Sequence, residues 1–269
     1  MEKAPGSEKT RVDILLVERG LVPSRERARA LILAGRVLVR EQKVDKPGTT
    51  VPADSPIRLL GEDQPYVSRG GLKLAEALNH WKIPMAGRAC LDVGASTGGF
   101  TDCLLQHGAA HVTAVDTGFG QIAMKLRNDP RVRVVERTNA RFLAPTALAG
   151  EKGRPELTLL AIDVSFISAT LLLGPVLAAA PALSEAVILV KPQFEAGRKH
   201  VGKGGIVRDP EAHQLAIDKV AECVRSLGWQ VVETIPSPIT GAEGNREFLL
   251  YARRPGSTEP IGEGKPALA

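Results

Sequence analysis

Residues 92–100 read DVGASTGGF; they close an apolar run at 89–93 and precede a stretch with helical periodicity. Glycine at such a strand–helix junction permits backbone conformations with positive φ and lets a ligand approach bare backbone. The order differs from the dinucleotide fingerprint G-x-G-x-x-G, since Ser96 stands where the second glycine would be. The stretch predicts a nucleotide-binding loop, whose candidate cofactor-binding residues are Gly94, Ala95, Ser96, Thr97, Gly98, Gly99 and Phe100.

The rest of the chain alternates apolar runs with helical stretches. The predicted strands are 89–93, 111–115, 132–135, 157–162, 186–190, 229–235 and 247–252. Such alternation is typical of an α/β fold with helices on both faces of a mostly parallel sheet. We therefore expect a Rossmann-like, doubly wound, seven-stranded sheet. Residues 192–208, rich in Gly and Lys, are predicted to form a long functional or mobile loop.

Polar residues follow the second and third predicted strands. Asp116 ends the second strand, about 20 residues beyond the glycine loop, where a carboxylate can accept hydrogen bonds from both ribose hydroxyls of an adenosine. Asn139 and Ala140 follow the third strand, where a polar group can contact the adenine edge. Each residue alone is equally suited to capping a loop. Together they favour one adenosine pocket, and the arrangement resembles the S-adenosylmethionine site of Rossmann-like methyltransferases.

Residues 11–60 are predicted to form a small α+β domain. Val12, Leu15 and Leu16 mark one face of a short helix, and Ser24 is suited to cap a second helix over 25–34. A strand at 37–39 and a turn-rich β segment at 43–60 follow. Residues 61–67 are expected to be a linker, 68–254 the large domain, and 255–269 a disordered tail.

Positive charge is concentrated in this N-terminal part. Residues 1–60 hold 12 Lys and Arg against 8 Asp and Glu, whereas the rest of the chain holds 23 against 22. Such asymmetry is typical of a polyanion-binding domain. Judged by charge alone, however, a basic surface that is merely solvated is an equally good explanation. Exposed cations on a rigid platform suit RNA phosphates. The candidate RNA-binding residues are Arg11, Arg25, Arg29, Arg36, Arg40 and Lys43.

The composition excludes several classes of protein. No apolar run approaches the roughly 20 residues that cross a bilayer, and the charged N-terminus lacks a signal-peptide core. A cytoplasmic protein without a membrane partner is expected. Cys90, Cys103 and Cys223 have no metal-ligand spacing, so reduced thiols are expected and no metal is implied.

Four further polar residues have positions that suit a catalytic site. Asp163 and Lys191 end the fourth and fifth strands, Glu247 starts the last strand, and Lys73 precedes the sheet. The carboxyl ends of neighbouring parallel strands share one crevice, so Asp163 and Lys191 should meet near Gly94. A lysine at the end of an apolar strand is costly unless it is paired or functional.

Two resemblances give this pattern a meaning. The order of residues over 11–60 resembles the RNA-binding domain named after ribosomal protein S4. The Lys-Asp-Lys-Glu tetrad resembles that of FtsJ-type ribose 2′-O-methyltransferases, and the chain from Arg11 to Tyr251 resembles the TlyA family, often labelled haemolysin A. The second match is carried by Val67–Gly70, the Gly94 loop, and residues 129–132, 136–141, 163–168 and 191–195.

The resemblance implies a ribosomal RNA (cytidine-2′-O)-methyltransferase that uses S-adenosylmethionine and acts on ribosomal subunits. Lys191 would face the 2′-oxygen, Asp163 would orient Lys191 and border the methyl donor, and Lys73 and Glu247 would position Lys191 and the hydroxyl. No protein partner is implied. The alternatives are an assembly factor with an inactive methyltransferase domain, an NAD-dependent oxidoreductase and a pore-forming haemolysin. The subunit, the nucleotide and the oligomeric state are left open.

Overall fold

The computed structural model describes residues 9–60, 65–148, 155–241 and 243–256. The chain divides into two compact units, an N-terminal one that ends at Asp63 and a C-terminal one that begins at Gln64. The predicted tail from 257 onward, and residues 61–64 of the predicted linker, lie outside the described residues. None of the helices in the described segments is long and apolar enough to span a membrane.

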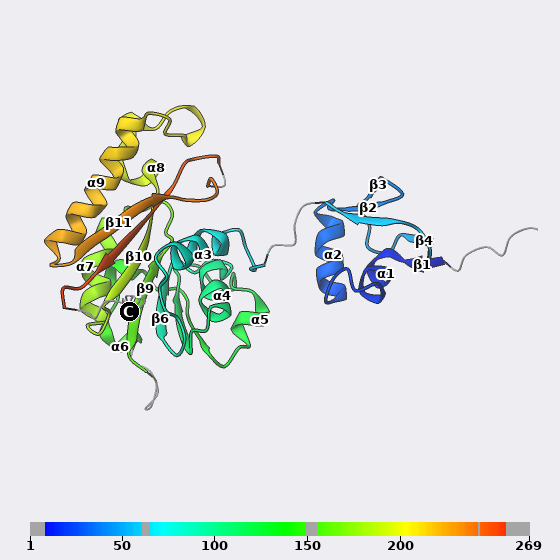
Figure 1. Ribbon diagram of the computed structural model, residues 1–269, viewed down its shortest axis with the longest axis horizontal. Coiled ribbons are helices and arrows are strands. Elements are labelled where there is room, and N and C mark those ends of the chain that lie inside the picture. Colours follow the sequence, from blue (N-terminus) through cyan, green and yellow to red (C-terminus); the bar gives the residue numbers. More distant parts are fainter. Residues whose placement is uncertain (1–8, 61–64, 149–154, 242, 257–269) are drawn as a thin grey trace, which may run out of the picture. The chain divides into compact units, whose positions relative to one another are not determined.

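The N-terminal unit contains two helices and short strands (Figure 1). In order these are β1 (Lys9–Arg11), α1 (Val12–Glu18), α2 (Arg25–Leu33), β2 (Val37–Val39), β3 (Gln42–Val44), β4 (Thr50–Pro52) and β5 (Ile57–Leu59). Ser24 caps α2 as expected, because its Oγ accepts a hydrogen bond from the Arg27 amide at 3.2 Å. The apolar faces of both helices pack on β2, so Val12, Leu16 and Ile32 have no exposed surface.

The C-terminal unit is built on a seven-stranded sheet with the spatial order β11-β12-β10-β9-β6-β7-β8. Its strands are β6 (Ala89–Val93), β7 (His111–Val115), β8 (Val132–Val135), β9 (Leu157–Ile162), β10 (Glu185–Val190), β11 (Gln230–Pro236) and β12 (Phe248–Arg253). Neighbouring strands from β8 to β10 pair in parallel, and β12 pairs antiparallel with both β10 and β11. The mostly parallel, seven-stranded α/β fold is confirmed.

Helices cover both faces of this sheet. They are α3 (Gly70–His80), α4 (Gly99–Gln106), α5 (Met124–Arg127), α6 (Pro145–Leu148), α7 (Thr170–Ala179), α8 (Pro192–Glu195) and α9 (Pro210–Ser226), with 3₁₀ turns η1 (Ala140–Phe142), η2 (Arg198–His200) and η3 (Lys203–Gly205). Successive strand residues point to opposite faces, so Leu160 and Ile162 pack with α7 and α9 while Leu159 and Ala161 pack with α3 and α4. Each face of the sheet therefore has its own hydrophobic core, and the strands contribute side chains to both.

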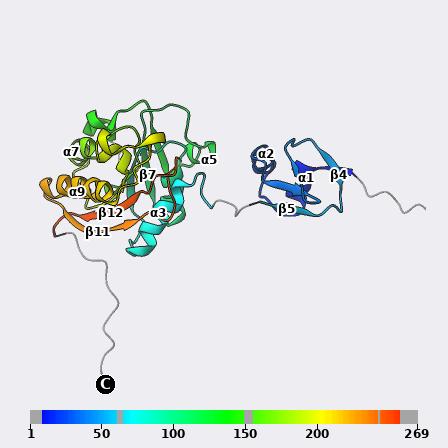
Figure 2. The same ribbon diagram turned by 90° about the horizontal axis from the view of Figure 1, so that it is seen from above.

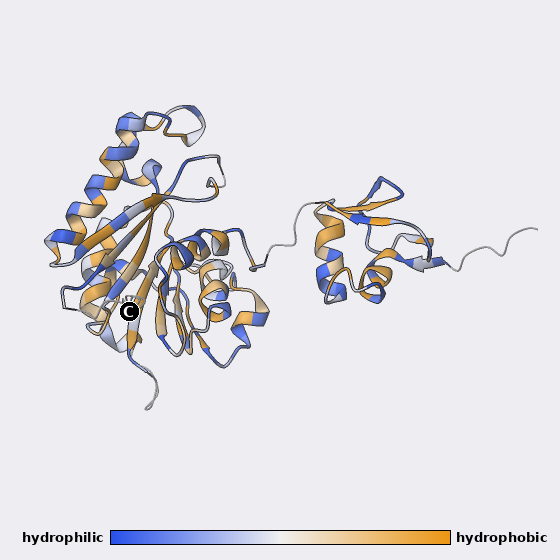
Figure 3. Ribbon diagram, in the orientation of Figure 1, coloured by the Kyte–Doolittle hydropathy of each residue, from blue (hydrophilic) through white to orange (hydrophobic). Residues whose placement is uncertain are grey.

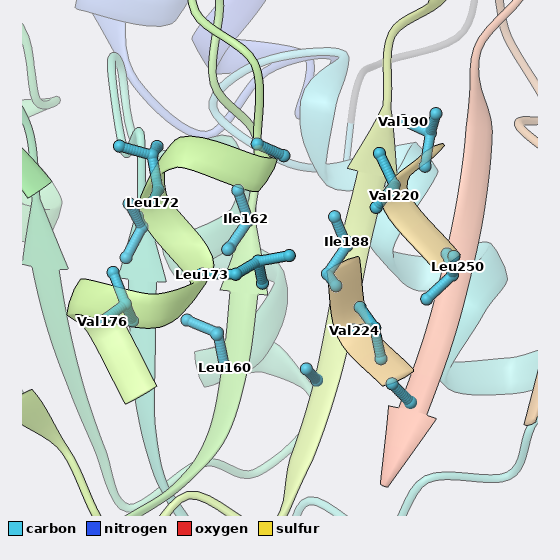
Figure 4. Packing of buried hydrophobic residues seen from close by; sticks show 14 of the residues in the cluster. Leu160, Ile162, Leu172, Leu173, Val176, Ile188, Val190, Val220, Val224 and Leu250 are labelled. Carbon is cyan, nitrogen blue, oxygen red and sulfur yellow. The ribbon is translucent and has the colours of Figure 1, made fainter. Parts of the chain in front are cut away.

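The face covered by α7 and α9 illustrates the packing. Figure 4 shows Leu173 of α7 near Ile162 of β9, and Val224 of α9 near Ile188 of β10. Hydrophilic and hydrophobic residues alternate along α9 (Figure 3), with Val220 and Val224 buried. The two views in Figures 1 and 2 place α9 beside β11 and β12. Burial on both faces explains why the central strands are almost wholly apolar.

The expectation of a long loop at 192–208 is only partly right. This segment contains α8, η2 and η3, three short helical turns. Pro192 supplies the first position of α8, where its missing N–H costs nothing. The buried Glu195 accepts a hydrogen bond from the Ala169 amide at the start of α7, at 2.7 Å. The start of the segment is thus attached to α7 rather than extended in solvent.

Candidate active site

The glycine loop between β6 and α4 has a conformation that depends on its glycines. Gly94 and Gly98 have φ values of +89° and +97°, which L side chains rarely adopt. A Cβ on Gly94 would lie 2.2 Å from the Asp163 carbonyl oxygen, and one on Gly98 would lie 2.2 Å from Leu126 Cδ1. Ser96, at the position where the dinucleotide fingerprint has glycine, also has a positive φ of 49°. The loop therefore brings bare backbone to the carboxyl edge of the sheet.

Asp116 holds this loop in place from the end of β7. One carboxylate oxygen accepts a hydrogen bond from the Ser96 amide at 2.8 Å, and the other accepts one from the Gly118 amide at 2.6 Å. A carboxylate offers about four lone-pair positions, so these two bonds leave room for ligand hydroxyls. Asp116 thus caps the loop, which is one of the two roles that its position suggested. It also lines a cavity.

That cavity has a volume of about 480 Å³ and lies over the carboxyl ends of β6, β7 and β9. The expected residues Gly94, Ser96, Asp116, Asn139 and Ala140 line it. Asn139 is also the N-cap of η1, since its Oδ1 accepts a hydrogen bond from the Arg141 amide at 3.0 Å. Successive strands therefore bring together the residues proposed for one adenosine.

A second cavity of about 780 Å³ adjoins the first, and Gly94, Ser96, Asp163, Ser165 and Phe166 line both. Ala95, Thr97, Gly99 and Phe100 line only the second cavity, while Gly98 packs against Leu126 rather than lining either one. The larger cavity contains the whole predicted tetrad: Lys73, Asp163, Lys191 and Glu247.

The tetrad forms two ion pairs in this cleft. Lys191 Nζ lies 2.5 Å from Asp163 Oδ1, and Lys73 Nζ pairs with Glu247 Oε2. Lys191, Lys73 and Glu247 expose less than a tenth of their surface. Buried charges of this kind are costly unless they are paired, which explains why each lysine lies against a carboxylate. Each lysine has a carboxylate partner, although the sequence placed only Lys191 beside its partner, Asp163.

Strand direction explains how Glu247 reaches this edge. Because β12 is antiparallel to β10, Phe248 at its start lies opposite Val190 at the end of β10. Glu247 therefore lies beside Lys191 at the carboxyl edge of the parallel strands. Gly241 leaves space there, since a Cβ on it would lie 2.5 Å from Glu247 Oε1. Lys73 reaches the same place from α3.

Several residues of the cleft were not singled out from the sequence. Ser165 Oγ accepts a hydrogen bond from Lys191 Nζ at 2.9 Å. Phe166 is 89% exposed, has a φ of 66°, and packs against the Phe194 ring at 5.4 Å. Asp92 is buried beneath the loop, and Thr101 Oγ1 donates a hydrogen bond to it at 2.6 Å. The sequence did contain one signal for Ser165. It stands two residues after Asp163, and in an extended segment such spacing places both side chains on the same side.

The candidate RNA-binding residues of the N-terminal unit have different surroundings. Arg11 and Arg25 both bind the fully buried Asp13, at 2.9 and 3.0 Å, and these hydrogen bonds, chiefly that of Arg11, lower the pKa of Asp13 to about 2. Arg36 Nε donates to the Leu60 carbonyl at 2.8 Å. These three arginines therefore hold the fold together, whatever else they contact.

The remaining three candidates lie at the surface of the same unit. Arg29 on α2 and Arg40 after β2 are exposed. Lys43 is exposed as well, but its side chain lies across Gly35, where a Cβ would be 2.6 Å from Nζ. A cation at the end of α2 is favoured by the helix dipole. Among the six candidates, Arg29 and Arg40 are thus the best suited to contact phosphates without also holding the fold together.

Comparisons with known proteins match both units. The FtsJ-like methyltransferase family model matches residues 66–254, and the S4 domain model matches residues 10–57. The 16S/23S rRNA (cytidine-2′-O)-methyltransferase TlyA of Mycobacterium tuberculosis is 45% identical, over 92% of this chain and 91% of its own length. Hemolysin A of Brachyspira hyodysenteriae is 39% identical, over 90% of this chain and 98% of its own. A solved hemolysin structure from Streptococcus thermophilus has 40% identity and a TM-score of 0.69, covering 93% and 90% of the two chains.

Proposed function

This chain belongs to the FtsJ-like methyltransferase family, and we propose that it transfers a methyl group from S-adenosylmethionine to the 2′-hydroxyl of a cytidine in ribosomal RNA. The observation that best supports this proposal is that both lysine–carboxylate pairs line one cleft. At Asp163 this cleft adjoins the cavity beside the glycine loop. The relative named as a cytidine-2′-O-methyltransferase supports the choice of nucleotide. Ribosomal subunits are the proposed substrate, and the cytoplasm is therefore the proposed location.

The residues of the smaller cavity suit S-adenosylmethionine. Asp116, at the end of β7, would accept hydrogen bonds from the ribose hydroxyls, and Asn139 with Ala140 would border the adenine. The backbone of Gly94, which lines both cavities, would face the methionine part. When bound, the cofactor supplies a methyl group on a sulfonium, which is a good leaving group. The cavity opens at Asp163 toward the cleft that would receive RNA.

The chain's own residues would then activate the hydroxyl. A ribose hydroxyl is a weak nucleophile, so the enzyme must orient it and favour its deprotonation. Lys191 would face the 2′-oxygen, as a cation that stabilises the developing negative charge and, in its neutral form, as the base. Asp163 would orient Lys191 across their 2.5 Å contact. Lys73 and Glu247, which form the second ion pair of the cleft, would position Lys191 and the hydroxyl.

The N-terminal unit would supply affinity and placement on RNA. Its match to the S4 domain model supports ribosomal RNA as the partner. Arg29 and Arg40 would contact phosphates directly, while Arg11, Arg25, Arg36 and Lys43 would contribute through the surface that they stabilise. An assembly factor without chemistry is disfavoured, because such a protein has no need to keep two buried lysine–carboxylate pairs in one cleft.

The decisive substitution is Lys191→Ala. We expect methyl transfer to ribosomal subunits to fall by at least about 100-fold, because an interaction needed in the transition state is removed, while RNA and cofactor affinities stay nearly unchanged. Lys191→Arg should not restore activity, since a guanidinium cannot act as a base and is too wide for a point contact. Transfer of labelled methyl groups to both subunits, followed by mapping of blocked 2′-hydroxyls, measures this.

Lys82→Ala is the matched control, because Lys82 is exposed and lies outside both cavities. A melting curve of each variant separates catalysis from folding. If Lys191 merely neutralises Asp163, Lys191→Ala should unfold at lower temperature and Lys191→Arg should be active. A stable, active Lys191→Ala protein would contradict the proposed mechanism.

A further inference from the structure

The Lys191 ammonium has two acceptors on the same short segment. Asp163 Oδ1 lies 2.5 Å from Nζ, and Ser165 Oγ lies 2.9 Å from it. An ammonium carries three hydrogens in a tetrahedral arrangement. With two of them directed at Asp163 and Ser165, the third has a single remaining direction. The Lys191 side chain is 10% exposed and lines the larger cavity, so this third N–H is the one left for a substrate in the cleft.

Ser165 lies where both cavities meet. It follows β9 by three residues, lines the cavity beside the glycine loop as well as the cleft of the tetrad, and is exposed to them. Its Oγ accepts from Lys191, so its own hydroxyl hydrogen is still available to donate. Asp163 alone would leave the ammonium able to rotate about its contact. A second acceptor at a fixed place removes that freedom.

We propose that Ser165 is a positioning residue for the reaction: its hydroxyl, together with Asp163, holds the Lys191 ammonium so that one N–H points at the ribose 2′-oxygen. This inference rests on the proposed function and adds a residue outside the Lys-Asp-Lys-Glu tetrad. The role belongs to the turnover step, since Ser165 does not hold the loop or either core. Its removal should therefore affect kcat more than KM.

The test compares Ser165→Ala with Ser165→Thr in the full-length protein. Ser165→Ala should lower kcat for ribosomal subunits by about 10- to 100-fold, the usual effect of removing one hydrogen bond to a charged group. KM for RNA and the Kd for S-adenosylmethionine should stay within about twofold. Ser165→Thr keeps the hydroxyl and should recover most of the rate. Ser226→Ala, whose native Oγ donates to the Cys223 carbonyl at the end of α9, is the control.

The pH profile distinguishes positioning from a structural role. Ser165 accepts a hydrogen bond from a cation of the cleft, so without this acceptor the kcat profile should move to lower pH in Ser165→Ala and return in Ser165→Thr. The other charged residues that line the cleft are the same in all three proteins: Arg69, Lys73, Asp163, Glu243 and Glu247. A structural role would lower the melting temperature and leave the profile in place.

The outcomes separate this inference from the proposed function. A Ser165→Ala protein with wild-type kcat and profile, alongside an inactive Lys191→Ala protein, would overturn the role of Ser165 alone. A Ser165→Thr protein as slow as Ser165→Ala would also overturn it, because the hydroxyl would then be irrelevant. Absence of methylation by the wild-type protein would overturn the proposed function and this inference together.

Discussion

Asp92 shows how one carboxylate beneath the glycine loop responds to its surroundings. It has no exposed surface, accepts one hydrogen bond from Thr101 and has an Oδ1 that finds no hydrogen-bond donor among the described residues. Burial raises its pKa from the usual 3.8 to about 7, and the negative charges of Asp163 and Asp116 contribute to the rise. The proton state of this residue therefore changes close to neutral pH.

This shift makes the stability of the C-terminal unit depend on pH. Because the folded protein binds the Asp92 proton more tightly than the unfolded chain, this group stabilises the fold most below about pH 4, and the contribution disappears as the pH rises to about 7. Between about pH 5 and about pH 8 the decrease should be of the order of 3 kcal/mol. Asp92→Asn, which cannot titrate, should remove this part of the pH dependence.

Urea unfolding at both pH values measures the effect. Both tryptophans, Trp81 and Trp229, lie in the C-terminal unit, so their fluorescence follows that unit alone. Other titrating groups contribute equally to the two proteins and cancel in the comparison. Equal pH slopes for wild type and Asp92→Asn would show that Asp92 is ionised in the folded state throughout this range.

The loop between β6 and α4 is the element on which both cavities depend. We predict that Gly94→Ala destabilises the C-terminal unit by more than the roughly 1 kcal/mol that a positive φ costs, because its Cβ would also collide with the Asp163 carbonyl. S-adenosylmethionine binding should be abolished, since the loop and the Asp163 segment must separate. Calorimetry and thermal melting give the two readouts.

Gly87→Ala is the matched control for this prediction. Gly87 has a similar φ of +74°, but nothing lies within 4 Å of the Cβ that would be added. It should therefore show the backbone cost alone, with cofactor affinity unchanged. If Gly94→Ala behaves like Gly87→Ala, the close approach of the loop to Asp163 is not required for binding.

The two compact units of the chain are proposed to have different roles, and the candidate RNA-binding residues Arg29 and Arg40 make this testable. Replacing both Arg29 and Arg40 with Glu should weaken RNA binding and reduce the slope of log K against log salt by about 1 for each phosphate that is no longer neutralised. Cofactor affinity should stay the same, because these residues belong to the other unit. Filter binding at several salt concentrations measures the slope.

Arg25→Glu should behave differently, although Arg25 is also on α2. It would place a second negative charge beside the buried Asp13, so the N-terminal unit should unfold more readily. Circular dichroism detects that unfolding, and Lys82→Glu in the other unit controls for the change in net charge. A salt slope that is unchanged in the Arg29 and Arg40 double variant would mean that these arginines are only a solvated surface.

Local patterns in the sequence were enough to predict the strands, the glycine loop and the placement of Asp163 and Lys191 at strand ends. This works because buried parallel strands must be apolar, and because a polar residue directly after such a strand lies at its carboxyl edge. Three strand boundaries differed by one residue: 186–190 became Glu185–Val190, 229–235 became Gln230–Pro236, and 247–252 became Phe248–Arg253. Glu247, which was expected to start the last strand, therefore directly precedes it. The short helical turns within 192–208 were missed, since each spans only three or four residues, too few to show a helical period in the sequence.

The pairing of Lys73 with Glu247 could not be derived from those patterns, because it joins residues 174 positions apart. It depends on β12 running against its neighbours, which brings the start of that strand to the edge where β10 ends. The same is true of Arg11 and Arg25, whose shared partner Asp13 is buried only when α1 and α2 pack together. Sequence periodicity records which face of an element is apolar, whereas strand direction and helix packing decide which charged residues meet.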